Sequence, residues 1–542
     1  MIIERIVIEN YRLIKHADFI INTDMNIFVG DNDSGKSTLL EALAILTSGK
    51  LNGFAFERQL KANLFNDEVR RSYIDSLYDP VAVQSPPKIF FEAYCVDSDD
   101  NAEYKGTNNS RNENCPGIRV DVEFNLEYEP TYKRMLETNE VFDIPVEFYI
   151  VRYRYFVGEQ IHYRFCPIKA AFIDTTRKDY SHVVDRFISE NITAYLSEQE
   201  QIDLSTAYRK SRNDFHTNEL VEKLNENVKE NVHIGDRSLT IDLKEEEVDE
   251  WKRQMSVIVD ATPFENIGFG TQNTIKIELA IKHSAEQVNM ILMEEPENNL
   301  SFTSMAKLIQ RIYETEGKQI FVSTHSSYVA NKLELKKLLL VRLGEVFAFN
   351  ELNDETVRYF NKLPGYDTLR LVLAERVILV EGATDELIIQ RAYLDKYEKL
   401  PIINGIDIIT VNSLAFKRYC DIAILMKKPI SIITDNDGNI DKNITQKYDG
   451  YIGNDYCNFF YESDEELNTI EPSVVAANME GDTPSETFLK AISKNSSMLG
   501  KTADEARAYM GNNKVEWAMR VFDSPEKIQY PGYVKNVIEQ YD

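Results

Sequence analysis

"MNIFVGDNDSGKSTLLEALAIL", residues 25–46, is the stretch with the strongest local pattern in the chain. An apolar run ending at Val29 is typical of a buried strand, Gly30–Ser37 fits G-x-x-x-x-G-K-[ST], and the residues that follow have helical periodicity. Glycines let the backbone wrap closely around phosphates, Lys36 supplies a positive charge, and the helix N-terminus adds its partial positive charge. A chance glycine-rich turn is the alternative, and the flanking strand and helix argue against it. The pattern predicts a nucleotide site formed by Gly30, Asn32, Gly35, Lys36, Ser37 and Thr38, with the Ser37 hydroxyl as a ligand of Mg²⁺.

Composition limits the class of protein. At 542 residues the chain is too long for one core. Its net charge of −28 argues against a basic nucleic-acid coat and against binding to anionic membranes, although a local basic groove stays open. The five cysteines have no paired spacing, so neither a disulfide framework nor a zinc site follows from them. With no apolar run near the length of a membrane span, we expect a cytoplasmic protein.

A second apolar run in the N-terminal half ends in acids. In "VNMILMEEPENNL", residues 288–300, five apolar residues lead into Glu294 and Glu295. We expect Glu294 to hold magnesium through water and Glu295 to polarise the attacking water, the alternative being a strand that runs into a charged turn. The next strand, in "QIFVSTHSSYVAN", ends at His325, which could reach the γ-phosphate, although a structural cap is the commoner role for such a histidine.

Two glycines open a further helix between these pieces. In "NIGFGTQNTIKIELAI", residues 266–281, Gly268 and Gly270 precede the helix and Gln272 lies in its first turn. A helix N-terminus of this kind can bind phosphate, including phosphate presented by the other half of a dimer. By itself this pattern is weak.

The segment between the nucleotide loop and these pieces is an insertion. Its first part alternates as antiparallel strands, and about 170–250 is typical of helices with mixed charge, either a dimerisation arm or solvated hairpins. The aromatic and basic run "YIVRYRYF", residues 149–156, could be a nucleic-acid face, but alternating aromatics are more often the packed side of a strand.

The C-terminal half starts a second α/β pattern. "RVILVEGATDELIIQRAYLDKY", residues 376–397, is a strand, a glycine turn and a helix, and the strands "GIDIITV" and "PISIITDND" follow with a helix between them. This order predicts a parallel sheet whose active crevice lies outside the carboxyl ends of its strands. Glu381, Asp435 and Asp437 all fall at that edge. Since like charges repel without a cation between them, the acids predict a Mg²⁺ or Mn²⁺ site rather than a solvated turn.

The order of the N-terminal motifs, "NYR", "GDNDSGKST", "GFGTQ", "EEPENN" and "VSTHS", resembles the ABC-type ATPase domains of the RecF/SMC-like class. The resemblance covers roughly 1–345. It implies that ATP is sandwiched between two heads, with the helix at Gly268, Gly270 and Gln272 capping the nucleotide of the other head. Glu294 replaces the usual aspartate and "GFGTQ" replaces a serine-glycine-glycine signature, which leaves the hydrolysis rate open more than nucleotide binding.

The later motifs resemble the Toprim domains of topoisomerases, primases and some nucleases, in which an acid ends one strand and D-x-D ends another. Glu386 matches a second acid of the nuclease branch, Glu471 resembles the later acid that completes a two-metal site, and Lys514 resembles a basic residue near the end of that branch. Glu471 is equally well read as a surface acid, and for Lys514 a surface role is the more frequent one.

An ABC-type ATPase followed by a Toprim domain resembles the OLD (overcoming lysogenization defect) family, which includes the nuclease subunit of Gabija systems and some retron effectors. The resemblance implies an α/β chain with an ATPase domain over 1–345, a linker over 346–374, and a Toprim nuclease domain with a C-terminal helical extension over 375–542. It also implies an ATP-binding DNA endonuclease or nickase in antiphage defence. Its partners would be DNA, further copies in a dimer or tetramer formed through the ATPase heads, and an operon partner such as a helicase or a retron reverse transcriptase with its DNA.

The resemblance assigns the catalytic chemistry to a small set of side chains. Two divalent ions, Mg²⁺ or Mn²⁺, would be held by Glu381, Glu386, Asp435, Asp437 and Glu471. Lys514 would neutralise charge on the scissile phosphate. The main alternative is an ATPase sensor or scaffold whose Toprim domain binds nucleic acid without cutting it. A topoisomerase or primase is a third reading, but the ATPase head in front of the Toprim core is not their arrangement.

Overall fold

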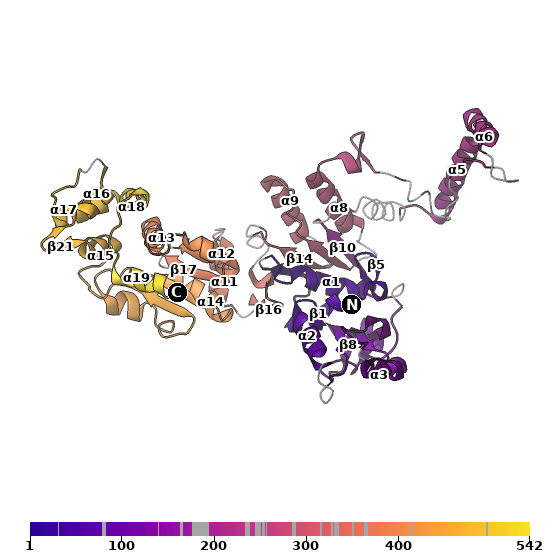
Figure 1. The fold of residues 1–542 in the computed structure, drawn as a ribbon, viewed down its shortest axis with the longest axis horizontal. Helices are drawn as coiled ribbons and strands as arrows, with labels where there is room; N and C mark the ends of the chain where they lie inside the picture. The colour runs from indigo at the N-terminus through magenta and orange to yellow at the C-terminus, as the bar shows by residue number, and fades with distance from the viewer. Residues whose placement is uncertain are drawn as a thin grey trace. The chain divides into compact units, whose positions relative to one another are not determined.

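The computed structural model divides into two compact units, 1–26 with 37–324 and 27–36 with 325–542 (Figure 1). None of the helices formed by its described residues combines the length and the apolar character that a membrane crossing needs. The residues described are 1–30, 32–77, 83–138, 140–162, 166–175, 195–232, 239–243, 251, 255, 257–283, 289–314, 317–326, 329, 335–349, 352–362, 367–411, 415–494 and 497–541.

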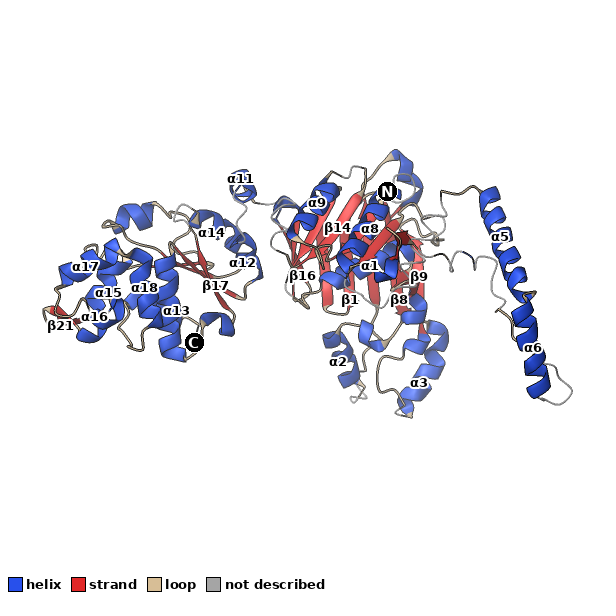
Figure 2. Cartoon of the chain, turned by 90° about the horizontal axis from the view of Figure 1, so that it is seen from above, coloured by secondary structure: helices blue, strands red, loops and turns tan. Residues whose placement is uncertain are grey.

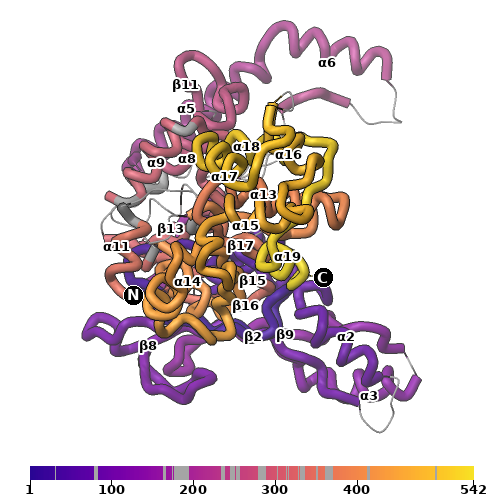
Figure 3. The backbone as a smooth tube through the Cα atoms, turned by 90° about the vertical axis from the view of Figure 1, so that its left-hand side faces the viewer, coloured from indigo at the N-terminus to yellow at the C-terminus, as the bar shows by residue number. Residues whose placement is uncertain are grey.

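An antiparallel sheet makes up much of the N-terminal unit. Its strand order is β2-β1-β6-β8-β7, and β9 also pairs with β8. Every residue of β6 is buried. Helices α2 and α3 lie side by side beyond it (Figures 2 and 3), and the hydroxyls of Tyr73 and Tyr132 are 2.7 Å apart. The bounds are β1 Ile3–Tyr11, β2 Ile14–Ile20, β6 Ile89–Cys95, β7 Lys105–Gly106, β8 Cys115–Phe124, β9 Tyr149–Tyr155, α2 Asp67–Ser76 and α3 Glu129–Glu137.

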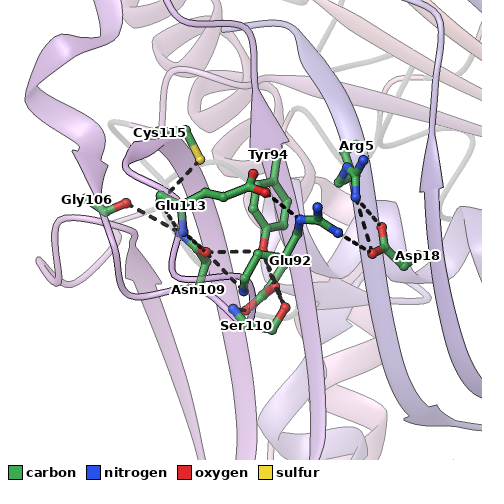
Figure 4. Close-up of polar contacts among 10 residues, drawn as sticks. Arg5, Asp18, Glu92, Tyr94, Gly106, Asn109, Ser110, Glu113 and Cys115 are labelled. Carbon is green, nitrogen blue, oxygen red and sulfur yellow. Dashed lines mark hydrogen bonds and ion pairs between the residues drawn. The ribbon is translucent and has the colours of Figure 1, made fainter.

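A buried carboxylate fastens a loop to this sheet (Figure 4). Glu92, on β6, is fully buried and accepts hydrogen bonds from the Ser110 amide at 2.8 Å and the Ser110 hydroxyl at 2.6 Å. The Tyr94 hydroxyl donates to it at 2.9 Å, and the Arg119 guanidinium pairs with it. A buried charge is tolerated only when it is paired and hydrogen-bonded, and these donors meet that need.

The basic and aromatic strand β9 belongs to the same sheet. Tyr153 and Tyr155 are buried, the Arg154 guanidinium lies 2.6 Å from an Asp121 oxygen, and Arg152 lies 3.1 Å from Glu123. Its aromatic residues are therefore packing residues, and both arginines are paired with acids of β8.

The second large sheet positions the nucleotide loop. Its order is β10-β13-β14-β3-β15-β16; β10, β13 and β14 pair in parallel, as do β3 and β15. The residues of β3, β13 and β14 are all buried, as expected for strands covered on both faces. The bounds are β3 Met25–Val29, β10 Ala170–Asp174, β13 Met290–Glu294, β14 Gln319–Thr324, β15 Leu338–Arg342, β16 Glu345–Ala348, α1 Lys36–Ser48, α8 Phe269–His283 and α9 Phe302–Tyr313.

The described residues of the insertion include two helices. They are α5, Glu198–His216, and α6, Glu219–Asn231, and neither contains a buried residue. Ser197 caps α5 and Asn218 caps α6 through their side chains. Much of the expected insertion, including 176–194 and 244–250, lies outside the described residues. Short two-stranded ribbons elsewhere are β4–β5 (Lys50–Leu51, Phe54–Ala55), β11–β12 (Ile258–Val259, Thr262–Pro263) and β21–β22 (Met479–Glu480, Thr483–Pro484).

The C-terminal unit contains the parallel sheet that the sequence predicted. Its order is β18-β17-β19-β20, with every pair parallel. The C-terminal helices gather around α13 and α15 (Figures 2 and 3), and Trp517 and Val534 are fully buried in that core. The bounds are β17 Arg376–Val380, α13 Ala383–Tyr397, β18 Ile406–Thr410, α14 Phe416–Leu425, β19 Ile430–Ile433, β20 Cys457–Phe460, α15 Ile470–Ala477, α16 Glu486–Ile492, α17 Ala503–Asn512, α18 Lys514–Asp523 and α19 Gly532–Glu539.

In the segment expected as a linker, the residues that the structure describes form the helices α11 (Asp354–Lys362) and α12 (Asp367–Leu373). Thr356 donates from its hydroxyl to Asp421 of α14 at 2.6 Å. The buried Lys428 ammonium donates to the Leu371 carbonyl at 2.7 Å, close to the C-terminal end of α12. These contacts fasten both helices to the parallel-sheet domain.

Candidate functional site

The nucleotide loop closes on itself through Lys36. This residue begins α1, is 6% exposed, and donates from Nζ to the Gly30 carbonyl at 2.8 Å. A Cβ at Gly30 would lie 2.2 Å from the Val341 carbonyl oxygen, so only glycine fits at that point. Gly35 has φ of 111°, which L side chains rarely adopt. Asn32 is exposed and Thr38 is 7% exposed, so the loop presents Asn32 outward while Thr38 is packed at the start of α1.

Two residues that the sequence assigned to Mg²⁺ are in direct contact. The Ser37 hydroxyl donates to the Glu294 carboxylate, although 257 positions separate them in the chain. Glu294 is the last residue of β13 and is 8% exposed. A hydroxyl and a carboxylate oxygen are the hard ligands that Mg²⁺ takes. The pair therefore fits a Mg²⁺–nucleotide site.

Glu295 follows in a strained, well-anchored backbone. Its φ is 45°, its amide donates to the Ser323 carbonyl at 2.9 Å, and its own carbonyl accepts from Thr175 at 2.5 Å. Its carboxylate accepts from the Asn298 amide at 2.9 Å. His325 is exposed directly after β14, the strand that pairs with β13, so both residues come from the carboxyl ends of neighbouring strands.

The start of α8 is fixed by contacts within the chain. A Cβ at Gly270 would lie 2.3 Å from the Asn299 carbonyl oxygen, whereas one at Gly268 would meet nothing within 4 Å. The Gln272 side chain is 8% exposed and donates from Nε2 to the carbonyls of Phe264 at 2.9 Å and Ile267 at 3.1 Å. The Gln272 amide nitrogen thus holds the turn that precedes α8, a use that its position in the sequence does not reveal.

The acids of the parallel sheet meet at its carboxyl edge. Glu381 follows β17, and Asp435 follows β19 after one intervening residue. The Asp435 amide donates to Glu381 Oε1 at 3.2 Å, and the Thr434 hydroxyl donates to the same oxygen at 2.5 Å. Asp437 lies in the turn beyond, with φ of 48°. The structure thus brings Glu381 and the D-x-D segment together, as parallel pairing of β17 and β19 requires.

A fourth carboxylate, Asp385, belongs to this group and was missed in the sequence. It lies in the first turn of α13, is 8% exposed, and accepts from the Gly382 amide at 3.0 Å. Burial, and next the charge of Glu381, raise the pKa of Asp385 to about 7. Burial, followed by the charges of Asp385, Glu381 and Glu471, raises the pKa of Asp435 to about 9. The available signal was the third position of the helix that follows "EG", where an acid caps the helix start.

The other predicted residues lie around this group. Glu386 accepts from the Thr410 hydroxyl at 2.7 Å and from the Gln390 amide at 3.1 Å. Glu471, in the first turn of α15, accepts from the Thr469 hydroxyl at 2.9 Å. Lys514 is exposed as the first residue of α18, and no hydrogen bond or ion pair in the described part of the chain joins it to the acids.

The donor chemistry at this edge suits a divalent cation. Carboxylate oxygens are the ligands of Mg²⁺ and Mn²⁺, and clustered carboxylates repel unless a cation or a proton lies among them. In the described ranges, no three Asp, Glu, His or Cys side chains converge as ready-made metal ligands. Glu381, Glu386 and Glu471 instead accept hydrogen bonds from threonine hydroxyls. The acids at this edge therefore suit a cation because their ligand atoms are carboxylate oxygens and because they carry like charge.

Comparison with known families matches two separate stretches of the chain. A model described as "AAA ATPase domain" matches residues 1–330, and one described as "Overcoming lysogenization defect protein-like, TOPRIM domain" matches residues 372–437. No curated protein matches the chain.

Solved structures show a distant likeness. The SMC head domain of Pyrococcus furiosus with an extended coiled coil, bound to the C-terminal domain of ScpA, is 12% identical over 67% of this chain and 98% of that chain, with a TM-score of 0.35. The SMC head domain of Thermotoga maritima is 11% identical over 64% and 99%, with a TM-score of 0.31. The recombination mediator RecF bound to ATPrS is 10% identical over 64% and 98%, with a TM-score of 0.32.

Proposed function

The chain is an OLD-family protein with an AAA ATPase domain and a Toprim domain, and from that premise we propose that it is a divalent-metal-dependent DNA endonuclease or nickase controlled by its ATPase domain. One observation carries the proposal. The Asp435 amide donates to Glu381 Oε1 at 3.2 Å, and burial, followed by the charges of Asp385 and Glu381, raises the pKa of Asp435. Such a concentration of like charge is unfavourable in a merely structural site, and a bound cation makes it favourable.

In this proposal the acids hold the metal and the lysine meets the substrate. Glu381, Asp435 and Asp437 would be ligands, joined by Glu386, Glu471 and the buried Asp385. Divalent ions at such a site activate a water and stabilise the leaving oxygen of the phosphodiester. The exposed Lys514 ammonium would neutralise charge on the scissile phosphate.

The nucleotide residues would act as the switch. Lys36 would leave the Gly30 carbonyl and bind the β- and γ-phosphates, while Ser37 and Glu294 would hold the accompanying Mg²⁺. Glu295 would orient the attacking water, with His325 at the γ-phosphate. The start of α8 would approach the nucleotide of a second copy, so Gly268 and Gly270 would contribute backbone amides and Gln272 would keep that turn in shape.

The experiment is cleavage of supercoiled plasmid by the full chain in Mg²⁺ or Mn²⁺. We expect nicking or linearisation by the parent and none by the double variant D435A/D437A. The matched control is D441A/D449A, which removes two exposed acids from the same unit and the same amount of charge. If D435A/D437A cuts as fast as the parent, the Toprim domain does not cleave, and a sensor or scaffold that only binds nucleic acid is favoured.

Antiphage defence is supported by the OLD-like Toprim domain. Cells that express the parent should give fewer phage plaques than cells that express D435A/D437A at equal protein level. Equal plaque numbers for both would separate cleavage from defence.

Size-exclusion chromatography with ATP, comparing the parent with Lys36→Ala, tests assembly through the ATPase heads.

A further inference from the structure

The carboxyl edge of the parallel sheet β18-β17-β19-β20 is called the Toprim edge below. Three of the acids at this edge accept a hydrogen bond from the same kind of partner, a threonine hydroxyl. The pairs are Thr434 with Glu381, Thr410 with Glu386, and Thr469 with Glu471. We propose that these threonines are positioning residues, each of which fixes one carboxylate for divalent-metal binding. The inference rests on the proposed nuclease function and extends it to residues that no sequence motif marks.

Thr434 is the most enclosed of the three. It follows β19, is 2% exposed, and its hydroxyl lies 2.5 Å from Glu381 Oε1. The Asp435 amide donates to the same oxygen at 3.2 Å. Because both donors bind Oε1, that oxygen is fixed, and Glu381 Oε2 is left for another partner.

Thr410 controls Glu386 from a neighbouring strand. It is the last residue of β18, which pairs with β17, and its hydroxyl lies 2.7 Å from Glu386 Oε2. The Gln390 amide donates to Oε1 at 3.1 Å, so donors on both sides orient the carboxylate. Thr410 thus links the helix that carries Asp385 and Glu386 to the sheet.

Thr469 occupies the N-cap of α15 and does not use its hydroxyl for the cap. An N-cap threonine normally accepts a hydrogen bond from an amide of the first turn. This side chain makes no such bond and instead lies 2.9 Å from Glu471 Oε2. A helix-capping role therefore does not account for the orientation of this hydroxyl.

The chemistry of the partner is what favours a metal site. A neutral hydroxyl orients a carboxylate and favours its charged form, yet leaves the negative charge for a cation. A lysine or arginine at the same place would compete with the metal. Among the described residues, no salt bridge joins Glu381, Glu386 or Glu471 to a basic side chain. Hydrogen-bonded support of ligating carboxylates contributes about 10- to 100-fold to metal affinity in known sites.

The test is Mn²⁺ binding to the full chain without nucleotide, measured by electron paramagnetic resonance of free Mn²⁺. Thr434→Val keeps the shape and removes the donor, and Thr434→Ser keeps the hydroxyl. We expect about 10- to 100-fold weaker Mn²⁺ binding for the valine variant and near-parent binding for the serine variant. The Mn²⁺ concentration for half-maximal plasmid cleavage should rise in parallel, with a smaller change in the rate at saturating Mn²⁺.

Thr410→Val and Thr410→Ser repeat the comparison at a less buried position, and they decide the matter if Thr434→Val does not fold. The inference is overturned if the valine variants bind Mn²⁺ as the parent does, or if serine fails to restore binding. A parent that binds no Mn²⁺, or D435A/D437A that binds it equally well, would instead overturn the proposed function.

Discussion

The nucleotide loop and the Toprim edge both place charged residues at the end of a buried parallel strand, but they balance the charge differently. In the nucleotide loop the Lys36 ammonium binds the Gly30 carbonyl, and Ser37 binds the Glu294 carboxylate. At the Toprim edge, carboxylates are neighbours of carboxylates, and burial with mutual repulsion raises the pKa of Asp385 to about 7 and that of Asp435 to about 9. One site satisfies its charges internally, whereas the other has excess negative charge that a cation would balance. From this difference we expect a divalent metal to raise the thermal stability of the Toprim domain more than ATP raises the stability of the nucleotide loop.

The largest effect should come from Asp435. In EDTA at neutral pH, Asp435→Asn should raise the thermal midpoint, because burial and the neighbouring acids raise the pKa of Asp435 to about 9, and an acid whose pKa is raised on folding destabilises the fold above its unfolded pKa. Adding Mn²⁺ at about 100 times its dissociation constant should stabilise the parent by about 2.7 kcal/mol and leave this variant unchanged. Differential scanning fluorimetry without nucleotide measures both, with Lys36→Ala as the control that keeps the Mn²⁺ effect. If Asp435→Asn keeps the full rise in thermal midpoint on addition of Mn²⁺, the contrast drawn between the two sites is wrong.

The next largest effect should come from Lys36, the cation of the nucleotide loop. Lys36→Ala removes a charged hydrogen bond to the phosphates, which contributes about 1.5–3 kcal/mol, so ATP should bind about 10- to 100-fold more weakly. Isothermal titration calorimetry of the protein with ATP, in the presence of Mg²⁺, measures this affinity. The matched control is Lys50→Ala, which removes an exposed lysine just after α1. Unchanged ATP affinity in Lys36→Ala would show that the loop is not the nucleotide site.

Substitutions of Gly268, just before α8, and of Gly270, in the first turn of α8, should differ in their effect on stability. Gly270→Ala should cost about 1–3 kcal/mol of stability, because its Cβ would meet the Asn299 carbonyl oxygen at 2.3 Å. Gly268→Ala should cost under about 1 kcal/mol, since nothing lies within 4 Å of a Cβ there. Urea unfolding of both variants, alongside their ATPase rates, provides the measurement. Equal destabilisation would mean that the contact between α8 and the loop after β13 is not maintained in solution.

The smallest effect concerns strand β9. Arg152 is paired with Glu123 on an exposed sheet face, so Arg152→Ala should change stability by about 0.2–1 kcal/mol and leave DNA affinity within about twofold. Lys514→Ala should slow cleavage if its ammonium meets the scissile phosphate. Fluorescence anisotropy with a labelled duplex measures the DNA affinity of both variants, and plasmid cleavage measures their cleavage rates. A large loss of DNA affinity in Arg152→Ala would revive the nucleic-acid interpretation of this strand.

The sequence by itself determined the two α/β domains, the nucleotide loop, and the acids that end β17 and β19. These features are encoded within single segments, where apolar runs, glycine positions and the spacing of Asp435 and Asp437 suffice. Parallel pairing then carries Glu381 to Asp435 without further information.

Only the tertiary structure decided which side chains meet across segments. Successive helical residues point about 100° apart, so the phase of α13, fixed by packing, places Asp385 in the acid group and turns Glu386 toward Thr410. The same reason hid the threonine partners and the inward use of Gln272. A segment specifies its own periodicity, but the rotation of a helix against a sheet depends on the whole core.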